Sequence, residues 1–295
     1  MSWASTVSKP YRIDHGKDFR LKDFDPASTG HLRSKEHAKE LLERSIAEMA
    51  DLQDKLYAQD RWAILLIFQA MDAAGKDGAI KHVMSGVNPQ GCQVYSFKQP
   101  SSEDLQHDFL WRSNRVLPER GHIGIFNRSY YEEVLVVRVH RDLLKNERLP
   151  EPLITKDIWR ERFEDIANLE KHLSRNGTVV RKFFLNVSKK EQKRRFLERL
   201  DTPDKNWKFS VADVRERECW GDYMKAYAEM IAETSSKHAP WYVIPADNKW
   251  FTRLAVAAAI VDTLQELDVA YPPVDADKRK ELAAARAELE RKKKP

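Results

Sequence analysis

Two kinds of hydrophobic pattern dominate the middle of this 295-residue chain. In residues 34–57, apolar side chains recur at three- and four-residue steps, which predicts one face of an amphipathic helix. Residues 62–68 form instead a continuous apolar run of strand length, as expected for a parallel strand buried on both faces. Further strands are predicted at 91–97, 122–126, 179–187 and 241–245.

Helices are predicted between nearly all of these strands. Residues 79–84 continue as a helix after the first strand, and residues 102–117 are predicted as another, for which Ser101 and Asp104 could form a capping pair. Strands and helices that alternate in this way favour an α/β fold of three layers. The prediction is a parallel five-stranded sheet flanked by helices.

The remaining segments differ in composition from this core. Residues 1–35 are polar and show no sustained period, which predicts an N-terminal arm, and residues 36–270 are predicted as one domain. Within it, residues 188–217 are crowded with Lys and Arg and are expected to form a helical projection over the sheet edge. Residues 271–295 are expected to form a charged C-terminal tail, with a solvated helix favoured over an anion-binding arm.

Composition excludes several classes of protein. No apolar run approaches the roughly 20 residues that span a bilayer, and the N-terminus lacks the apolar stretch of a signal peptide. A cytoplasmic protein without a membrane partner is therefore expected. Cys92 and Cys219 show no metal-binding spacing, which argues against a disulfide framework or zinc site. The net charge of +5 is weak evidence for an anionic partner.

The loop after the first strand, residues 72–78, resembles a phosphate-binding loop. Gly75 and Lys76 stand before a helix, where backbone amides and an ammonium group can bind phosphate. Two positions depart from the Walker A pattern, since Ala70 replaces the first Gly and Asp77 replaces the Ser or Thr that binds magnesium. Asp72 could bind magnesium instead, or it could only cap the turn.

Two further clusters carry candidate phosphate ligands. Residues 124–133 lie at the carboxyl end of a buried strand, so their polar side chains should face the phosphate-binding loop. There Arg128 is a candidate phosphate clamp or a partner of Glu132. Arg195 and Arg199 lie four residues apart and could point at one anion, as phosphoryl transfer requires, or lie on a solvated helix face.

Together, the motifs resemble the polyphosphate kinase 2 family over about residues 60–267. The resemblance rests on an ordered set of segments: 69–78 (QAMDAAGKDG), 126–135 (FNRSYYEEVL), 198–201 (ERLD), 207–209 (WKF) and 239–246 (APWYVIPA). Asn127 and Glu132 resemble the third class of that family, which acts on both AMP and ADP. The resemblance implies a P-loop kinase fold, similar to thymidylate kinases, with residues 188–217 as the lid.

The resemblance also implies roles for individual residues. Asp72 becomes a magnesium ligand with Asn127 as a secondary one, and Mn²⁺ is an alternative ion. The implied catalytic residues are Asp72, Lys76, Arg128, Arg195 and Arg199. Contacts to phosphate or nucleotide are expected from Ala73, Ala74, Gly75, Asp77, Gly78, Lys81, Arg112, Asn127, Ser129, Glu132, Lys182 and Lys208. Among these, Lys81, Arg112 and Lys182 are expected near the strand ends, where some would track polyphosphate.

The implied activity is Mg²⁺-dependent transfer of the terminal phosphate of polyphosphate to AMP, ADP or both. Guanine nucleotides are an additional candidate substrate, nucleic acid is not an expected partner, and a homodimer or homotetramer is expected. One alternative is a nucleoside monophosphate kinase with a triphosphate donor, which would have no use for a long basic track. A second is a non-enzymatic basic protein, which would leave Asp72 unexplained.

Overall fold

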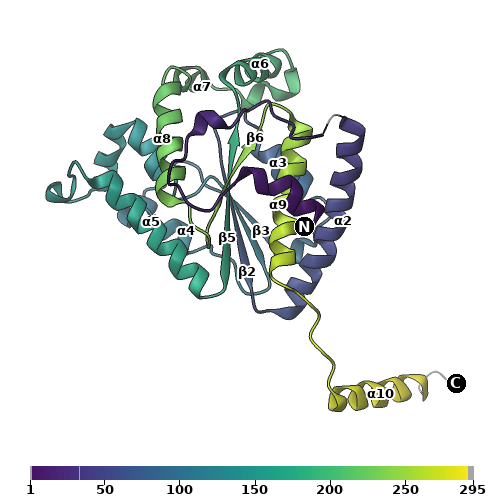
Figure 1. The fold of residues 1–295 in the computed structure, drawn as a ribbon. Helices are drawn as coiled ribbons and strands as arrows, with labels where there is room; N and C mark the ends of the chain where they lie inside the picture. Colours follow the sequence, from purple (N-terminus) through teal and green to yellow (C-terminus); the bar gives the residue numbers. More distant parts are fainter. Residues whose placement is uncertain (1, 33, 292–295) are drawn as a thin grey trace.

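The structure is a computed structural model that describes residues 2–32 and 34–291, apart from the side chains of Lys205, Trp207 and Lys208. In that part of the chain, a six-stranded sheet forms the centre and helices cover both of its faces (Figure 1). The strands, in their order across the sheet, are β1 (Arg12–Ile13), β6 (Trp241–Pro245), β5 (Thr178–Asn186), β2 (Ala63–Gln69), β4 (Ile123–Asn127) and β3 (Cys92–Ser96).

The five strands predicted from the sequence are present and parallel to one another. The predicted number was nevertheless wrong by one, because β1 adds a sixth strand. It comes from the N-terminal arm and runs antiparallel to β6, with Arg12 opposite Tyr242. A strand of two residues has no hydrophobic period, so the sequence pattern could not reveal it.

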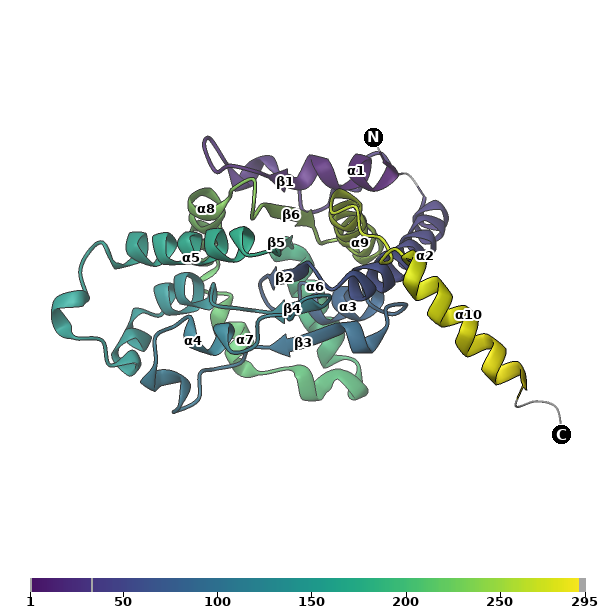
Figure 2. The same ribbon diagram turned by 90° about the horizontal axis from the view of Figure 1, so that it is seen from below.

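The helices form two layers, which Figure 2 shows from below. One face is covered by α2 (Lys35–Gln59), α3 (Lys76–Val83) and α9 (Lys249–Glu266), and α1 (Trp3–Ser8) packs on α9. The other face is covered by α5 (Ile158–Arg175), α8 (Trp220–Thr234) and the short α4 (Trp111–Asn114). This is the three-layer α/β arrangement that the sequence predicts.

The central strands of the sheet are deeply buried. Every residue of β2 is buried, and so are nearly all residues of β5. α9 is buried along most of its length because it lies between the sheet and the helices α1 and α2. The strands next to the centre therefore hold their carboxyl ends at a fixed edge, where the loops of the site begin.

The predicted helix at 102–117 was wrong. Ser101 and Asp104 do exchange the expected capping hydrogen bonds, but only a 3₁₀ turn, Asp104–Gln106, follows them. The side chain of Asp108 then accepts the amide of Leu110, an Asx turn that competes with helical hydrogen bonding. Helix resumes only as α4, which leaves this segment as an irregular wall beside the sheet.

The predicted projection is helical and follows β5 directly. It contains α6 (Lys189–Leu200) and α7 (Val211–Glu216), joined by a 3₁₀ turn at Pro203–Lys208, and lies at the top of the view in Figure 1. We call residues 188–217 the lid. Ser188 starts α6 by accepting the amide of Glu191, and a capping box of Ser210 and Asp213 starts α7.

The C-terminal tail carries α10 (Ala276–Arg291), whose side chains are exposed and which extends away from the body (Figure 1). Among the described residues, no helix is both long and apolar enough to cross a bilayer. Shorter elements complete the chain: 3₁₀ turns at Lys9–Tyr11, Leu21–Asp23, Pro89–Gly91, Arg141–Glu147 and Glu151–Leu153, and a π-helical turn at Glu133–Val137.

Candidate active site

The loop between β2 and α3 has the backbone geometry of an anion cradle. Ala73 and Gly75 adopt φ angles of 61° and 107°, both in the left-handed region. The chain therefore turns sharply before α3, and the amides of residues 75–78 have no acceptor among the described protein atoms. Free amides at a helix N-terminus attract phosphate, as the sequence predicts for this loop.

Lys76 lies in the first turn of α3 and is only 8% exposed. Its Nζ donates to the carbonyl of Ala70 at 2.7 Å. Burial, and then the nearby positive charge of Arg128, lower the pKa of Lys76 to about 8. No carboxylate among the described residues lies within 4 Å of this ammonium, so its counter-charge is incomplete in the protein alone.

Arg128 links the phosphate loop to the segment after β4. Its Nη2 donates to Asp72 Oδ1 at 2.9 Å, and its Nη1 donates to Glu132 Oε2 at 3.0 Å. The pairing with Glu132 that the sequence offered as one reading is thus present, while the role of Arg128 as a phosphate clamp stays a prediction. These two carboxylates raise the pKa of Arg128 against the opposing effect of burial. Its φ of 65° is strained for a non-glycine residue.

Oxygen donors for a metal ion lie in and beside the phosphate loop. Asp72, Asp77 and Asn127 all line one cavity, and Asn127 donates its side-chain amide to Asp77 at 2.8 Å. The described residues contain no cluster of three or more His, Cys, Asp or Glu side chains that could enclose an ion. Mg²⁺ is commonly held by one or two carboxylates together with substrate phosphates and water, so this oxygen set fits it.

That first cavity has a volume of about 870 Å³ and is bounded by the loop, the lid and α9. The predicted Arg199 lines it, with its guanidinium 5.6 Å from the ring centre of Phe196. Three basic residues in this wall were not predicted from the sequence: Lys98, Lys249 and Arg253. Lys249 begins α9 directly after the loop that follows β6, so the rule that ligands bind beyond strand carboxyl ends could have identified it.

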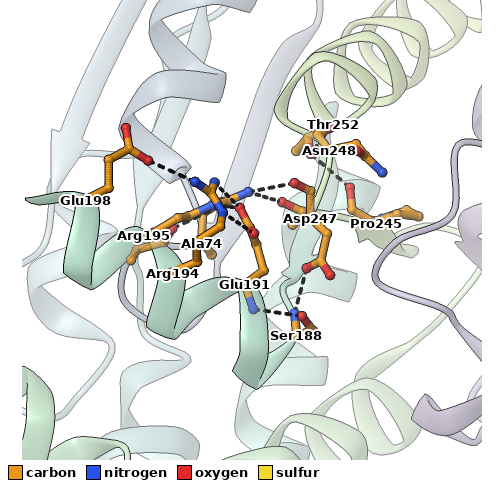
Figure 3. A network of polar contacts seen from close by, with 12 residues as sticks. Ala74, Ser188, Glu191, Arg194, Arg195, Glu198, Pro245, Asp247, Asn248 and Thr252 are labelled. Atoms are coloured by element: carbon orange, nitrogen blue, oxygen red, sulfur yellow. Dashed lines mark hydrogen bonds and ion pairs between the residues drawn. The ribbon is translucent and has the colours of Figure 1, made fainter. Parts of the chain in front are cut away.

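Arg195 departs from its predicted role as a phosphate donor. It is only 4% exposed, and its guanidinium is surrounded by protein acceptors: the carboxylate of Glu191 and four backbone carbonyls (Figure 3). A guanidinium has five N–H groups. In this structure none of them is left for an anion, although the side chain contributes to the cavity wall.

A second cavity, of about 1010 Å³, lies on the other side of Arg128. Lys98, Gln99 and Arg128 line both cavities, so the two meet there. The second cavity has many apolar side chains in its wall: Leu105, Phe109, Val136, Val137, Val139, Leu143 and Ile154. Arg112 also lines it, and its Nη1 donates to the carbonyl of Lys98 at 2.8 Å.

Acidic residues line the same second cavity. Arg162 contacts Glu133 at 3.0 Å and Glu147 at 3.6 Å. Burial, and then the neighbouring Glu133, raise the pKa of Glu147 to about 8, which favours the neutral form of its carboxyl group. Glu132 lies closer to the junction, where it binds Arg128.

The prediction that Lys182 faces a ligand was wrong. Lys182 lies inside β5 with a fully buried side chain, and its Nζ donates to Glu170 at 2.6 Å. The apolar residues around it in the strand place it in the core, where a charge requires a protein partner. Lys81 is exposed on α3 and does not line either cavity, and Ser129 is buried within hydrogen-bond distance of Gln69. The side chain of Lys208 lies outside the described residues.

Comparisons with known proteins identify the family of the chain. The family model described as Polyphosphate kinase 2 matches residues 32–272. The chain is 53% identical to the ADP-polyphosphate phosphotransferase of Rhodopseudomonas palustris, over 96% of this chain and 98% of that protein. It is 43% identical to the AMP/ADP-polyphosphate phosphotransferase of Meiothermus ruber, over 90% and 95%. The crystal structure of polyphosphate kinase 2 from Arthrobacter aurescens TC1 matches with a TM-score of 0.87 and 39% identity, over 97% and 99% of the two chains.

Proposed function

The chain belongs to the polyphosphate kinase 2 family, and from that premise we propose that it transfers the terminal phosphate of polyphosphate to both AMP and ADP with the help of Mg²⁺. Phosphate transfer between polyphosphate and a nucleotide is its activity as an enzyme of this family. The proposed transfer to both AMP and ADP rests on one observation, that two cavities meet at Arg128. A transfer between two substrates needs a binding site for each, and the two sites must adjoin where the phosphate is passed on.

The first cavity suits the polyphosphate donor. Its wall combines the free amides of the phosphate loop, the ammonium of Lys76 and the basic residues Lys98, Lys249 and Arg253. Each of these groups neutralises phosphate charge, and none of them is specific for a nucleobase or a sugar. A chain of phosphates can therefore occupy this cavity without any further recognition element.

The second cavity suits the nucleotide acceptor. Its apolar wall can hold a nucleobase, while Arg112 and Arg128 lie where the phosphate of a nucleotide would approach the donor. The cavity is large enough for a nucleoside mono- or diphosphate at about 1010 Å³. Relatives named as acting on AMP or ADP support adenine nucleotides as the acceptors.

A magnesium ion would be held at the loop by Asp72, with Asn127 or Asp77 as a further oxygen donor. When bound, it would neutralise charge on the transferring phosphate and orient its oxygens. Asp72 would then exchange part of its contact with Arg128 for the ion, which frees guanidinium N–H groups for phosphate.

The residues of the chain would act by positioning and by charge. An oxygen of the nucleotide phosphate attacks the terminal phosphorus of polyphosphate in line, and the bond to the next phosphate breaks without a covalent enzyme intermediate. Lys76 and the loop amides hold the donor phosphates. Arg128, at the junction, and Arg199, on the lid, neutralise the charge of the transition state.

The test is turnover without any nucleoside triphosphate. Wild-type protein with polyphosphate, Mg²⁺ and AMP should form ADP, and with ADP it should form ATP, as followed by chromatography. Assays with GMP, GDP and Mn²⁺ define the base and ion preferences. Product formation from AMP only when a triphosphate is added would show that the chain is a nucleoside monophosphate kinase instead.

Asp72→Asn separates metal-dependent catalysis from folding. We expect its turnover to fall by about 10²–10³-fold, because a neutral amide replaces the anionic metal ligand, with an unchanged unfolding temperature. Asp277→Asn, which removes an exposed carboxylate from α10, is the matched control and should keep wild-type turnover. Wild-type activity in Asp72→Asn would remove Asp72 from the mechanism.

A further inference from the structure

Arg195 lies in α6 of the lid, but its guanidinium is bound by two other parts of the chain. Its Nη1 donates to the carbonyls of Ala73 and Ala74 in the phosphate loop, at 3.0 and 2.7 Å. Its Nη2 donates to the carbonyls of Ala246 and Asp247 after β6, at 2.6 and 3.1 Å. Figure 3 shows the guanidinium between Ala74 and the turn that carries Asp247.

The orientation of Arg195 is fixed from its own helix. Its Nε donates to Glu191 Oε1 at 2.8 Å, one turn earlier in α6. Glu191 in turn is held by Arg194, whose hydrogen bond is the largest cause that lowers the pKa of Glu191 to about 2. The acceptor thus remains a carboxylate at any physiological pH, and the plane of the Arg195 guanidinium is set before a substrate arrives.

The turn after β6 is itself anchored on several sides. The Asp247 carboxylate accepts the amide of Ser188 at 2.8 Å, at the start of α6. The N-terminal arm also holds this turn, because the amide of Asp247 donates to Pro26 and the side chain of Asn248 donates to Ala27. Arg195 therefore connects the phosphate loop to a part of the protein that is fixed independently.

The carbonyls that Arg195 binds belong to the strained part of the phosphate loop. Ala73 has a φ of 61°, which an alanine adopts only when its surroundings impose it. A carbonyl and the following amide lie in one peptide plane and point in opposite directions. Holding the carbonyls of Ala73 and Ala74 thus turns the next amides away from Arg195. The amide of Ala74 donates to the carbonyl of Met71 at 3.3 Å, and that of Gly75 has no acceptor among the described protein atoms.

From these contacts we infer that Arg195 is a positioning residue, which holds the phosphate loop in its anion-binding shape and does not itself ligate the transferred phosphate. This inference rests on the proposed function, because it assigns the donor phosphate to the loop. It leaves Arg199 as the lid arginine that contacts phosphate. Arg194 holds Glu191 and so belongs to the same network, whereas the exposed Lys193, two positions before Arg195 in α6, serves as the control for a basic residue of this helix.

One peptide reports directly on this contact. Ala74–Gly75 is the single Ala–Gly step in the sequence, so labelling with ¹³C-carbonyl alanine and ¹⁵N glycine gives one carbonyl–amide NMR correlation. That correlation contains the carbonyl that Arg195 Nη1 binds at 2.7 Å. In ligand-free protein, Arg195→Lys should shift this peak, whereas Lys193→Arg and Arg199→Lys should leave it in place.

Steady-state kinetics give the second readout. Arg195→Lys should lower kcat/KM for polyphosphate by about 100-fold, with a raised KM for polyphosphate and a KM for the nucleotide within about twofold, because the loop is displaced. Lys193→Arg should keep wild-type values. A wild-type peak position in Arg195→Lys, together with a lower kcat and an unchanged KM for polyphosphate, would show that Arg195 acts on phosphate directly and would overturn the inference.

A milder variant covers the case in which Arg195→Lys does not fold. Glu191→Gln keeps Arg195 but weakens the bond that orients it, so the same peak should shift in the same direction and kcat/KM should fall by about tenfold. An unshifted peak in Glu191→Gln would also contradict the inference. A wild-type chain without polyphosphate-dependent turnover would refute the proposed function, whereas the ligand-free peak tests Arg195 separately.

Discussion

Lys76 and Lys182 are both buried beside the central strands, but their surroundings differ. Lys182 has three protein acceptors for its three N–H groups: Glu170 at 2.6 Å, the carbonyl of Thr234 at 2.7 Å and Tyr131 at 3.1 Å. Lys76 has backbone carbonyls only, because the nearby Asp72 is bound to Arg128. Burial lowers the pKa of both lysines.

This difference separates a structural lysine from one that awaits a ligand. A buried charge is tolerated when the protein supplies its partner, and Glu170 does so for Lys182. Lys76 faces a cavity, and part of its counter-charge has to come from an anion in that cavity. Burial and residue type are shared by the two sites, so the location of the counter-charge is the informative feature.

The largest expected effect comes from Lys76→Met. We expect kcat/KM for polyphosphate to fall by about 10⁴-fold, because a charged donor to the transferring group is lost. Stability should be unchanged or higher, since the variant removes a buried ammonium without a carboxylate partner. Steady-state assays with thermal unfolding measure both. A destabilised but active variant would make Lys76 a structural residue like Lys182.

Lys182→Met should show the opposite behaviour. The free energy of unfolding should fall by about 3–5 kcal/mol, because Glu170 would remain buried without its cation. Urea denaturation measures this loss, while kcat of the folded protein should stay near the wild-type value. The double variant with Glu170→Gln should recover much of the stability. A stable Lys182→Met variant with impaired turnover would instead show that Lys182 contacts a ligand, as the sequence predicted.

The sequence alone could not distinguish these two lysines. Lys76 was identified because its signal is local: a Gly-Lys pair between a strand and a helix. The partners of Lys182 come from α5, the segment after β4 and the end of α8, so only the folded chain brings them together. The same reason explains Arg195, whose helix position is local but whose acceptors lie in two distant loops.

Elements with strong periods were predicted most closely. The strand predicted at 241–245 has the observed bounds of β6, and α2 begins and ends within two residues of its prediction. The short β1 carries no such period and was missed, and the irregular segment before α4 was wrongly predicted as part of a helix. Lys249 and Arg253 were missed because the sequence of α9 is mostly apolar and the two basic residues in its first turns belong to no motif.

The pH dependence of kcat/KM tests whether the ammonium of Lys76 binds the donor phosphate. The pKa of Lys76 is lowered to about 8, so above pH 8 its ammonium loses the proton that a phosphate requires. In the free enzyme, kcat/KM for polyphosphate should therefore fall above pH 8, by up to about tenfold per pH unit. Bound phosphate raises this pKa, so the break in kcat should lie at higher pH. A flat kcat/KM profile from pH 7 to 10 would contradict this role of Lys76.

The smallest expected effect comes from Glu147, a half-buried group that lines a cavity and also has protein partners. Its pKa is raised to about 8, chiefly by burial and then by Glu133, so folding takes up a proton between about pH 4.5 and 8. The resulting stability is full below pH 4.5 and is lost as pH rises through 8. Glu147→Gln, which stays neutral, should lose less stability than wild type between pH 5 and 9. We expect a difference of about 1 kcal/mol, below the full linkage of about 1.4 kcal/mol per pKa unit, because Arg162 and solvent screen this half-buried carboxylate. Urea denaturation at both pH values measures the difference, with Glu151→Gln as the exposed control.

An equal pH dependence in Glu147→Gln and wild type would mean that the protein supplies Glu147 with a full counter-charge, as it does for Lys182.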